Sequence, residues 1–266
     1  MEFKNINSFN FHIQYIDAFP LEIVSGLDSH IHSECEIYIN LSGDVSFEVE
    51  NKIYPISPGD IIITRPYEYH HCIYHSNKKH KNFWILISPN GNEEFLDVFY
   101  KRKVGEKNLL TLSAQKTEEL IYLCHRLTQN SSDKFESYCD YFRLLSLISS
   151  ADVKKSNKKN YPADILYSLN YINEHLKDDI NINEIALAAN VSINTLERHF
   201  KDFFGITPSK YIQKKRLVNA AKLLSQGKTV TEASNESGFP DYSGFIALFR
   251  KTYGITPLKY KKKADH

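Results

Sequence analysis

The sequence predicts an α+β protein of two domains: a β-barrel followed by a helical hairpin, and then an all-α domain in which one helix pair occurs twice. Three observations predict this arrangement. Short runs rich in Ile, Val, Phe and Tyr fill the first part of the chain, and an internal repeat fills the last part. Charge also divides between the two parts: residues 1–153 carry 14 Lys and Arg against 21 Asp and Glu, a net charge of −7, whereas residues 154–266 carry 19 against 11, a net charge of +8.

The predicted boundaries follow from changes of pattern along the 266 residues. We expect the barrel at 1–112, the hairpin at 113–150, a linker rich in Lys, Ser and Asn at 151–160, and the all-α domain at 161–266. A chain of this length can bury a separate core in each domain.

The repeat is the most specific signal. The segment His199–Tyr211 returns as Leu248–Tyr260, 49 residues later, with the same Phe, Gly-Ile-Thr-Pro and Lys-Tyr positions. Each copy predicts two short helices joined by a tight turn, at about 182–204 and 230–253. In the first copy Asn181 or Asn183 can cap the first helix and Ser192 the second. The predicted buried stripe of that second helix is Leu196, Phe200 and Phe203.

A short helix, a turn and a second helix with a polar outer face form a helix-turn-helix unit, whose second helix fits the major groove of DNA. The run from Gly238 to Tyr260, with Phe239, Ser243, Phe249 and Thr256-Pro257 at its spacing, resembles the C-terminal domain of AraC/XylS-type transcription regulators. That resemblance implies a DNA-binding regulator that works with RNA polymerase. The basic charge of this half agrees with a phosphate-backbone partner.

Carrying the family pattern over by position predicts the DNA-contacting residues. We expect base-specific contacts mainly from the first helix-turn-helix unit and phosphate contacts mainly from the second, because Ala247 stands in the second unit where relatives often have a long polar side chain. The predicted contact residues are Asn194, Thr195, Glu197, Arg198, Lys201, Asp241, Tyr242, Ser243, Arg250 and Lys251.

Residues 1–112 predict many short strands separated by turn signals such as Ser57-Pro58-Gly59, which is typical of a barrel or a double-sheet jelly roll. The predicted strands are Phe11–Ile16, Cys35–Leu41, Val45–Val49, Lys52–Ile56, Asp60–Thr64, His71–His75 and Asn82–Ile87.

Two runs inside this region, from His30 to Gly43 and from Pro58 to His70, resemble the two cupin motifs. In metal-binding cupins the matching residues would be His30, His32, Glu36 and His70, although His71 could replace His70. Glu68 stands where the motif has glycine. We expect a pocket for an organic effector, such as a sugar or another polar molecule, rather than a metal ion or a barrel without a ligand. The predicted effector residues are His30, His32, Glu36, Tyr38, Tyr67, Tyr69, His70 and Trp84.

A change of period after residue 112 predicts the hairpin helices Thr117–Gln129 and Asp133–Ser149. In the resembling regulators this region carries a dimer contact, so we expect a homodimer; packing against the barrel is the alternative. The four cysteines show no zinc-binding spacing, and no run is apolar enough to cross a membrane. We therefore expect reduced thiols in a cytoplasmic, nucleoid-associated bacterial protein.

The predicted function is sequence-specific transcription regulation, as an activator, under control of a small effector and without enzymatic activity or a required cofactor. Two alternatives remain at this point: a metal-dependent cupin enzyme fused to a DNA-binding domain, and a regulator that uses the barrel only for assembly.

Overall fold

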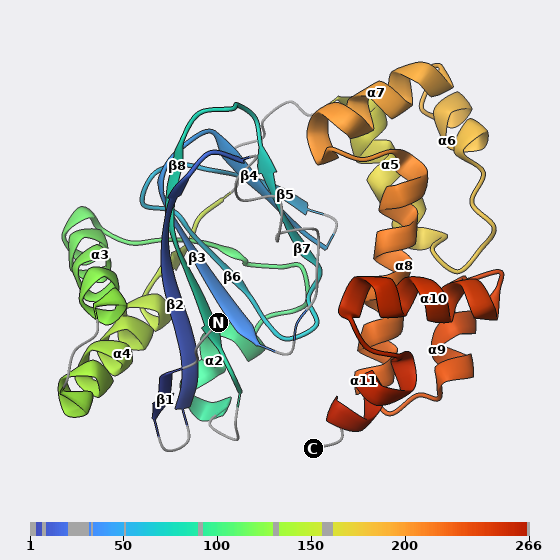
Figure 1. Cartoon of the computed structure of the whole chain (residues 1–266). Helices are drawn as coiled ribbons and strands as arrows, with labels where there is room; N and C mark the ends of the chain where they lie inside the picture. The colour runs from blue at the N-terminus through green and yellow to red at the C-terminus, as the bar shows by residue number, and fades with distance from the viewer. Residues whose placement is uncertain are drawn as a thin grey trace. The chain divides into compact units, whose positions relative to one another are not determined.

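The computed structural model describes residues 4–6, 9–20, 32, 34–50, 52–89, 93–129, 133–155 and 162–264. The chain divides into two compact units, residues 1–158 and residues 159–266 (Figure 1). The first unit holds the strands and the second is helical, as the sequence predicts. No helix within the described ranges combines the length and apolar character that crossing a bilayer requires.

Two antiparallel sheets build the first unit. The larger sheet has seven strands in the order β1-β2-β8-β3-β6-β9-β10, and the smaller has three in the order β5-β4-β7. The strands of the larger sheet are β1 Lys4–Ile6, β2 Phe9–Ala18, β3 Cys35–Ser42, β6 Ile61–Thr64, β8 His80–Ile87, β9 Leu109–Thr111 and β10 Asp152–Val153. Those of the smaller sheet are β4 Val45–Val49, β5 Lys52–Ile56 and β7 His70–Tyr74.

Of the two predicted forms, a barrel and a double-sheet jelly roll, the strands adopt the double-sheet form. No ladder among the described strands joins one sheet to the other, so the unit is a pair of facing sheets rather than a barrel. All seven predicted strands are present, with ends shifted by up to two residues, and the short strands β1, β9 and β10 add to them. Side chains of Tyr38, Phe47, Val49 and Ile62 form the apolar core between the sheets.

Alternation along the central strand β3 divides its side chains between two environments. Cys35, Ile37 and Ile39 lie in the core on the helical side of the sheet, whereas Glu36, Tyr38 and Asn40 alternate with them and therefore point to the other side. The register pairs Tyr38 with Trp84 of β8 and with Ile62 of β6. The interior between the sheets is therefore lined by polar and aromatic residues in the middle of an otherwise apolar strand.

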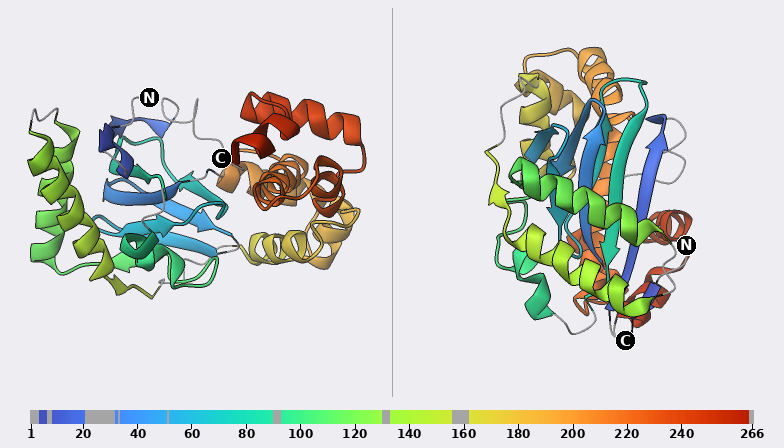
Figure 2. Two further views of the ribbon diagram at one scale, coloured as in Figure 1. Left: turned by 90° about the horizontal axis from the view of Figure 1, so that it is seen from below. Right: turned by 90° about the vertical axis from the view of Figure 1, so that its left-hand side faces the viewer.

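The predicted hairpin consists of α3 Ala114–Thr128 and α4 Lys134–Ser149, which lie across the outer face of the larger sheet (Figure 2). On α3 the predicted apolar face, Leu120, Leu123 and Leu127, is buried in the core. On α4 the period predicts a face of Phe135, Tyr138, Phe142, Leu145 and Ile148 or Ser149. Only Leu145 and Ile148 of that face are buried, and they are joined by Tyr141, Leu144 and Leu147. Phe135, in contrast, is 74% exposed.

Two smaller helical segments and a short strand complete the first unit. The 3₁₀ helix η1 Glu93–Leu96 leads into α2 Asp97–Tyr100. The predicted linker at 151–160 begins too early, because Asp152 and Val153 pair with β9 and Lys154 Nζ contacts both carboxylate oxygens of Asp60 at 2.7 Å. The first unit therefore continues through residue 155, and residues 156–161 lie outside the described residues.

The second unit contains seven described helices, and both predicted helix-turn-helix units are present. These helices are α5 Ala163–Glu174, α6 Ile182–Ala188, α7 Ile193–Phe204, α8 Pro208–Ser225, α9 Val230–Glu236, α10 Tyr242–Tyr253 and α11 Pro257–Ala264. Helix α8 runs from the α6–α7 pair to the α9–α10 pair (Figure 1). Its 18 residues span about 27 Å at 1.5 Å per residue.

Local capping explains why these helices begin and end where they do. The Ser192 side chain accepts a hydrogen bond from the Thr195 amide at the start of α7, and Gly205 ends that helix with a left-handed φ of 67°. The third buried residue of α7 is Phe204 rather than the predicted Phe203, because the ring of Phe204 packs against Tyr211 at the start of α8.

Candidate functional site

The second helix of the first helix-turn-helix unit, α7, presents a polar stripe opposite its buried face. Leu196, Phe200 and Phe204 anchor the helix, so the predicted contact residues lie on the outside. Asn194, Arg198 and Lys201 are exposed, and they follow one another at i, i+4 and i+7. Thr195 and Glu197 are half-buried at the edge of this stripe.

Existing contacts separate these side chains by availability. The Thr195 hydroxyl lies 2.9 Å from the Ser192 hydroxyl in the helix cap, and Glu197 pairs with Lys201 at 3.7 Å. Asn194 and Arg198 make no side-chain hydrogen bond or ion pair in the described part of the chain. Two side chains that can bond bidentately to a base edge are thus presented without an internal competitor.

The second helix-turn-helix unit presents a different set of side chains. The Asp241 carboxylate accepts hydrogen bonds from the amides of Ser243 and Gly244, at 3.2 and 2.6 Å, and so caps α10. Tyr242 and Ser243 are exposed beside it, and Arg250 and Lys251 are exposed in the last turn of the helix. Of these residues, the cations are the ones suited to phosphate.

A contact that sequence reasoning missed ties α8 and the turn of the second helix-turn-helix unit to the segment that leads into the first. Arg216 of α8 donates to the carbonyl oxygens of Leu176 (Nε, 3.0 Å) and Asp178 (Nη2, 2.6 Å), in the segment between α5 and α6. Gly238, in the turn of the second unit, packs so closely on the same Leu176 carbonyl that a Cβ there would lie 2.4 Å from the oxygen. We refer to Leu176, Arg216 and Gly238 as the inter-unit contact. No motif signals it, because its members lie far apart in the sequence.

In the sheet-containing unit, residues 1–158, the candidate site is a pocket between the two sheets. Its empty volume is about 410 Å³, including space open to solvent. Residues from β2, β3, β4, β7 and β8 line it: Ile16, Glu36, Tyr38, Phe47, His70, His71, Cys72, Tyr74, Asn82 and Trp84. Four predicted effector residues are therefore brought together here, namely Glu36, Tyr38, His70 and Trp84.

The other described residues of the predicted effector set, His32, Tyr67 and Tyr69, are not among those that line the pocket. Tyr67 and Tyr69 do not line the pocket, because they belong to the turn before β7, which begins at His70. Tyr67 instead donates its backbone amide to the His32 carbonyl oxygen at 3.0 Å. His30 lies outside the described residues. Alternation along β4 and β8 could have identified Phe47 and Asn82 as inward-facing, whereas Ile16 required the strand register.

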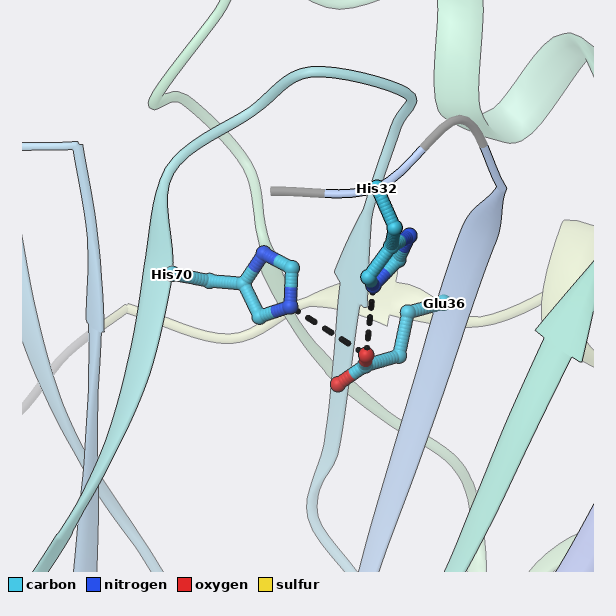
Figure 3. Close-up of side chains that lie close together, drawn as sticks. All are labelled: His32, Glu36 and His70. Atoms are coloured by element: carbon cyan, nitrogen blue, oxygen red, sulfur yellow. Dashed lines mark hydrogen bonds and ion pairs between the residues drawn. The ribbon is translucent and has the colours of Figure 1, made fainter. Parts of the chain in front are cut away.

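Three predicted ligands converge at one edge of the pocket (Figure 3). Oε2 of Glu36 lies 3.0 Å from Nε2 of His32 and 3.2 Å from Nε2 of His70. Burial by itself would raise the pKa of Glu36, but the charge of His70 and the hydrogen bonds to both imidazoles hold that pKa well below its ordinary value. Burial would lower the pKa of His70, but the Glu36 carboxylate outweighs it, and the pKa of His70 is raised.

A buried ion pair supports this edge of the pocket. Glu68, which replaces the motif glycine, accepts from both Nη atoms of Arg102, at 2.8 and 2.5 Å, and from the Gly105 amide at 2.6 Å. Burial favours a raised pKa for Glu68, yet the Arg102 hydrogen bonds and charge outweigh it and lower the pKa. Sequence reasoning missed Arg102, which lies 34 residues from its partner.

Comparisons with known proteins agree on both units. The family model for an AraC-like ligand binding domain matches residues 25–136, and the model for a helix-turn-helix domain matches residues 185–263. The chain is 25% identical over 233 residues to the probable transcriptional regulator LumQ of Photobacterium leiognathi, covering 87% of this chain and 91% of that one. It is 28% identical over 126 residues to the transcriptional activator RhaS of Escherichia coli, covering 47% of this chain and 45% of that one.

Solved structures with similarity include an AraC-type regulator from Chromobacterium violaceum, at 27% identity and a TM-score of 0.36, which covers 38% of this chain and 91% of that one. ToxT of Vibrio cholerae covers 96% of this chain and 98% of that one, at 16% identity and a TM-score of 0.39. The family assignment rests on the two family models and the sequence relatives. On these grounds the chain belongs to the AraC family of DNA-binding transcription regulators, with an N-terminal ligand-binding domain and a C-terminal helix-turn-helix domain.

Proposed function

We propose that this regulator activates transcription in response to a small polar organic molecule that binds in the pocket between the two sheets. Activation is the role named for its relative RhaS. The observation that carries the effector proposal is a set of buried polar atoms in the interior between the sheets. The Asn82 side chain lines the pocket and is buried, and its Oδ1 has no hydrogen-bond partner among the described residues.

Asn40 strengthens this argument, because it pairs with Asn82 across the β3–β8 ladder. It is fully buried, and neither atom of its side-chain amide has a partner in the described part of the chain. Buried amides without partners cost free energy, of the order of 1–3 kcal/mol each. A ligand with hydroxyl or amino groups would recover that cost at Asn82, which lines the pocket, and Trp84, Tyr38 and Phe47 would supply apolar faces around it.

Dimerisation is proposed through the hairpin. Phe135 and Phe142 of α4 are exposed, as is Cys139 between them, so an apolar stripe at i, i+4 and i+7 faces away from the core. Tyr122 of α3 is 59% exposed. Contiguous exposed apolar side chains mark interaction surfaces, and a second copy of the same hairpin is the partner that AraC-family membership favours.

The effector can control DNA binding only if it has different affinities for two arrangements of the dimer or the DNA-binding unit. We propose that contacts of the first helix-turn-helix unit with base edges specify the operator and that the second helix-turn-helix unit binds phosphate. The effector would shift the population of molecules that bind both half-sites.

Trp84 provides the test, because it is the only tryptophan in the chain and it lines the pocket. Sugars, hydroxy acids and amino compounds would be titrated while tryptophan fluorescence is recorded. The effector should change the fluorescence saturably in the native protein but not in Asn82→Leu, whereas Tyr122→Phe on the outer hairpin face should respond normally. A compound that saturates this response yet leaves operator affinity and transcription unchanged would contradict the proposal.

The dimer is tested separately by sedimentation. Phe135→Glu should shift the protein toward the monomer, and Leu187→Glu, an exposed position in the other unit, should not. Equal oligomeric states for the native protein and Phe135→Glu would argue against the hairpin as the dimer surface.

A further inference from the structure

The hydrogen bonds of His32 and His70 determine which ring nitrogens carry hydrogen. Nδ1 of His32 lies 3.1 Å from the carbonyl oxygen of Glu34, and Nδ1 of His70 lies 2.8 Å from the carbonyl oxygen of Glu68. A carbonyl oxygen can only accept, so each Nδ1 must donate. In a neutral imidazole the other nitrogen, Nε2, then carries a lone pair.

Both of these Nε2 lone pairs point at the same oxygen, Oε2 of Glu36 (Figure 3). Two imidazole acceptors and one carboxylate acceptor therefore meet, with all three candidate ligand atoms within 4.8 Å of one another. The carboxylate and His70 are buried, so water cannot screen this convergence of lone pairs. Only a positive species between the three groups, a metal ion or protons on the rings, makes the arrangement favourable.

We propose that His32, Glu36 and His70 bind one divalent first-row transition-metal ion at the edge of the pocket. One ion satisfies all three acceptors together, whereas protonation requires two positive imidazoles side by side in a largely buried site. The backbone carbonyls on Nδ1 supply the outer contacts that metal-binding histidines have, since these fix the ring and the tautomer. His30 lies outside the described residues, and the inference does not depend on it.

The two distances from the carboxylate to the imidazoles suit such an ion after a small expansion. A tetrahedral zinc ion with bonds of about 2.1 Å holds its ligands about 3.4 Å apart, compared with the 3.0 and 3.2 Å between Glu36 Oε2 and the two imidazoles. Two imidazoles and one carboxylate suit Zn²⁺, Fe²⁺ and Mn²⁺ better than Ca²⁺ or Mg²⁺, which prefer oxygen. Because Glu36 and His70 also line the pocket, a further coordination position would face its interior.

Arg102 acts as a positioning residue for this site. The Glu68 residue whose carbonyl orients His70 is held through its carboxylate by the two guanidinium nitrogens of Arg102 and by the Gly105 amide. Arg102→Lys keeps the charge but loses the paired geometry. We expect it to weaken metal affinity by about tenfold, as loss of an outer contact does elsewhere.

The test measures metal binding directly and does not depend on an effector or on DNA. Full-length protein stripped with chelator would be titrated calorimetrically with Zn²⁺, with Mn²⁺ and, without oxygen, with Fe²⁺, and its metal content determined after desalting. We expect one equivalent per chain for at least one of these ions, and no comparable binding of Mg²⁺. Glu36→Gln and His70→Gln should each weaken affinity at least 100-fold.

His71→Gln is the matched control, because His71 is the next residue on the same strand and also lines the pocket. It should bind metal as the native protein does, and circular dichroism in chelator should show all variants folded. Absence of a stoichiometric ion in the native protein would overturn the proposal in favour of protonated imidazoles. Equal affinities in Glu36→Gln, His70→Gln and His71→Gln would overturn it in favour of adventitious binding to surface groups.

Discussion

Replacing Gly238 by alanine tests the inter-unit contact with a single methyl group. Gly238 has a left-handed φ of 78°, and a Cβ there would lie 2.4 Å from the Leu176 carbonyl oxygen and 3.0 Å from Nε of Arg216. Gly254 is a matched control in the same unit, because its φ is 73° but a Cβ there would meet no atom within 4 Å. The two substitutions share the backbone cost and differ in the close contact.

The expected magnitudes follow from these two terms. Placing alanine in the left-handed region costs about 1–2 kcal/mol at either position. At Gly238 the Leu176 carbonyl must also move by about 1 Å, away from the Arg216 guanidinium that bonds to it, and such overpacking costs about 1–3 kcal/mol. Gly238→Ala should therefore destabilise the second helix-turn-helix unit by about 2–5 kcal/mol, and Gly254→Ala should destabilise it by about 1–2 kcal/mol.

Hydrogen exchange of the full chain, followed by mass spectrometry of peptides from α9, α10 and residues 175–181, measures this locally. In Gly238→Ala, exchange should accelerate both in the second helix-turn-helix unit and in the segment that carries Leu176. Gly254→Ala should accelerate exchange near α10 alone. If both variants accelerate exchange equally and the 175–181 peptide is unaffected in Gly238→Ala, the inter-unit contact does not hold the turn at Gly238 against residues 175–181.

Further predictions concern the DNA-facing helices, the buried ion pair and the thiols. Arg198→Ala should cost about 1–3 kcal/mol of binding free energy and relax the preference at one base pair, whereas Arg250→Ala should weaken binding to all DNA sequences alike. Binding to a randomised site library measures both effects. Equal loss of sequence preference from both changes refutes the division of labour between the two helix-turn-helix units. Arg102→Met leaves the Glu68 carboxylate buried without its partner and should cost about 3–5 kcal/mol at pH 7 in urea unfolding. The pKa of Glu68 is lowered in the folded state, so the ion pair stabilises the fold fully above the ordinary glutamate pKa, and this stability is lost as the pH falls from there through the folded pKa. The difference between native protein and variant should therefore shrink as the pH falls below about 4, the unfolded value; a pH-independent difference contradicts the assignment. Burial raises the pKa of the Cys35 and Cys72 thiols to about 12 each, and it also raises the pKa of the buried Cys124. A thiol reagent should therefore label Cys139 alone, because it is the exposed cysteine among the four. If the hairpin is the dimer surface, the labelling rate should fall as the protein concentration rises. Fast labelling that survives Cys139→Ser would contradict this.

The second unit was predictable because its signals are local. Ser192 and Gly205 mark the two ends of α7 within thirteen residues of each other, and the duplicated pattern places α10 by analogy. Even the error there is small, since Phe203 and Phe204 are neighbours and only the packing on Tyr211 selects between them.

The first unit was less predictable because its decisive contacts are distant in the sequence. Two apolar stripes run along α4, and the period alone cannot say whether the stripe of Phe135 or that of Tyr141 meets the sheet. The strand β10 has two residues, too few for a pattern, and it exists because β9 offers it a free edge. Likewise, the motif named Glu36 and His70 but not Arg102, whose role depends on a contact across the sheet.

The central claim is that one chain reads DNA through two helices carried by α8. Selection of bound duplexes from a randomised library by the full-length protein tests it most directly. We expect enrichment of two short motifs about one helical turn, 10–10.5 base pairs, apart, with the motif for the first helix-turn-helix unit lost in Arg198→Ala. Recovery of sequences no different from the starting library at moderate ionic strength would contradict the claim.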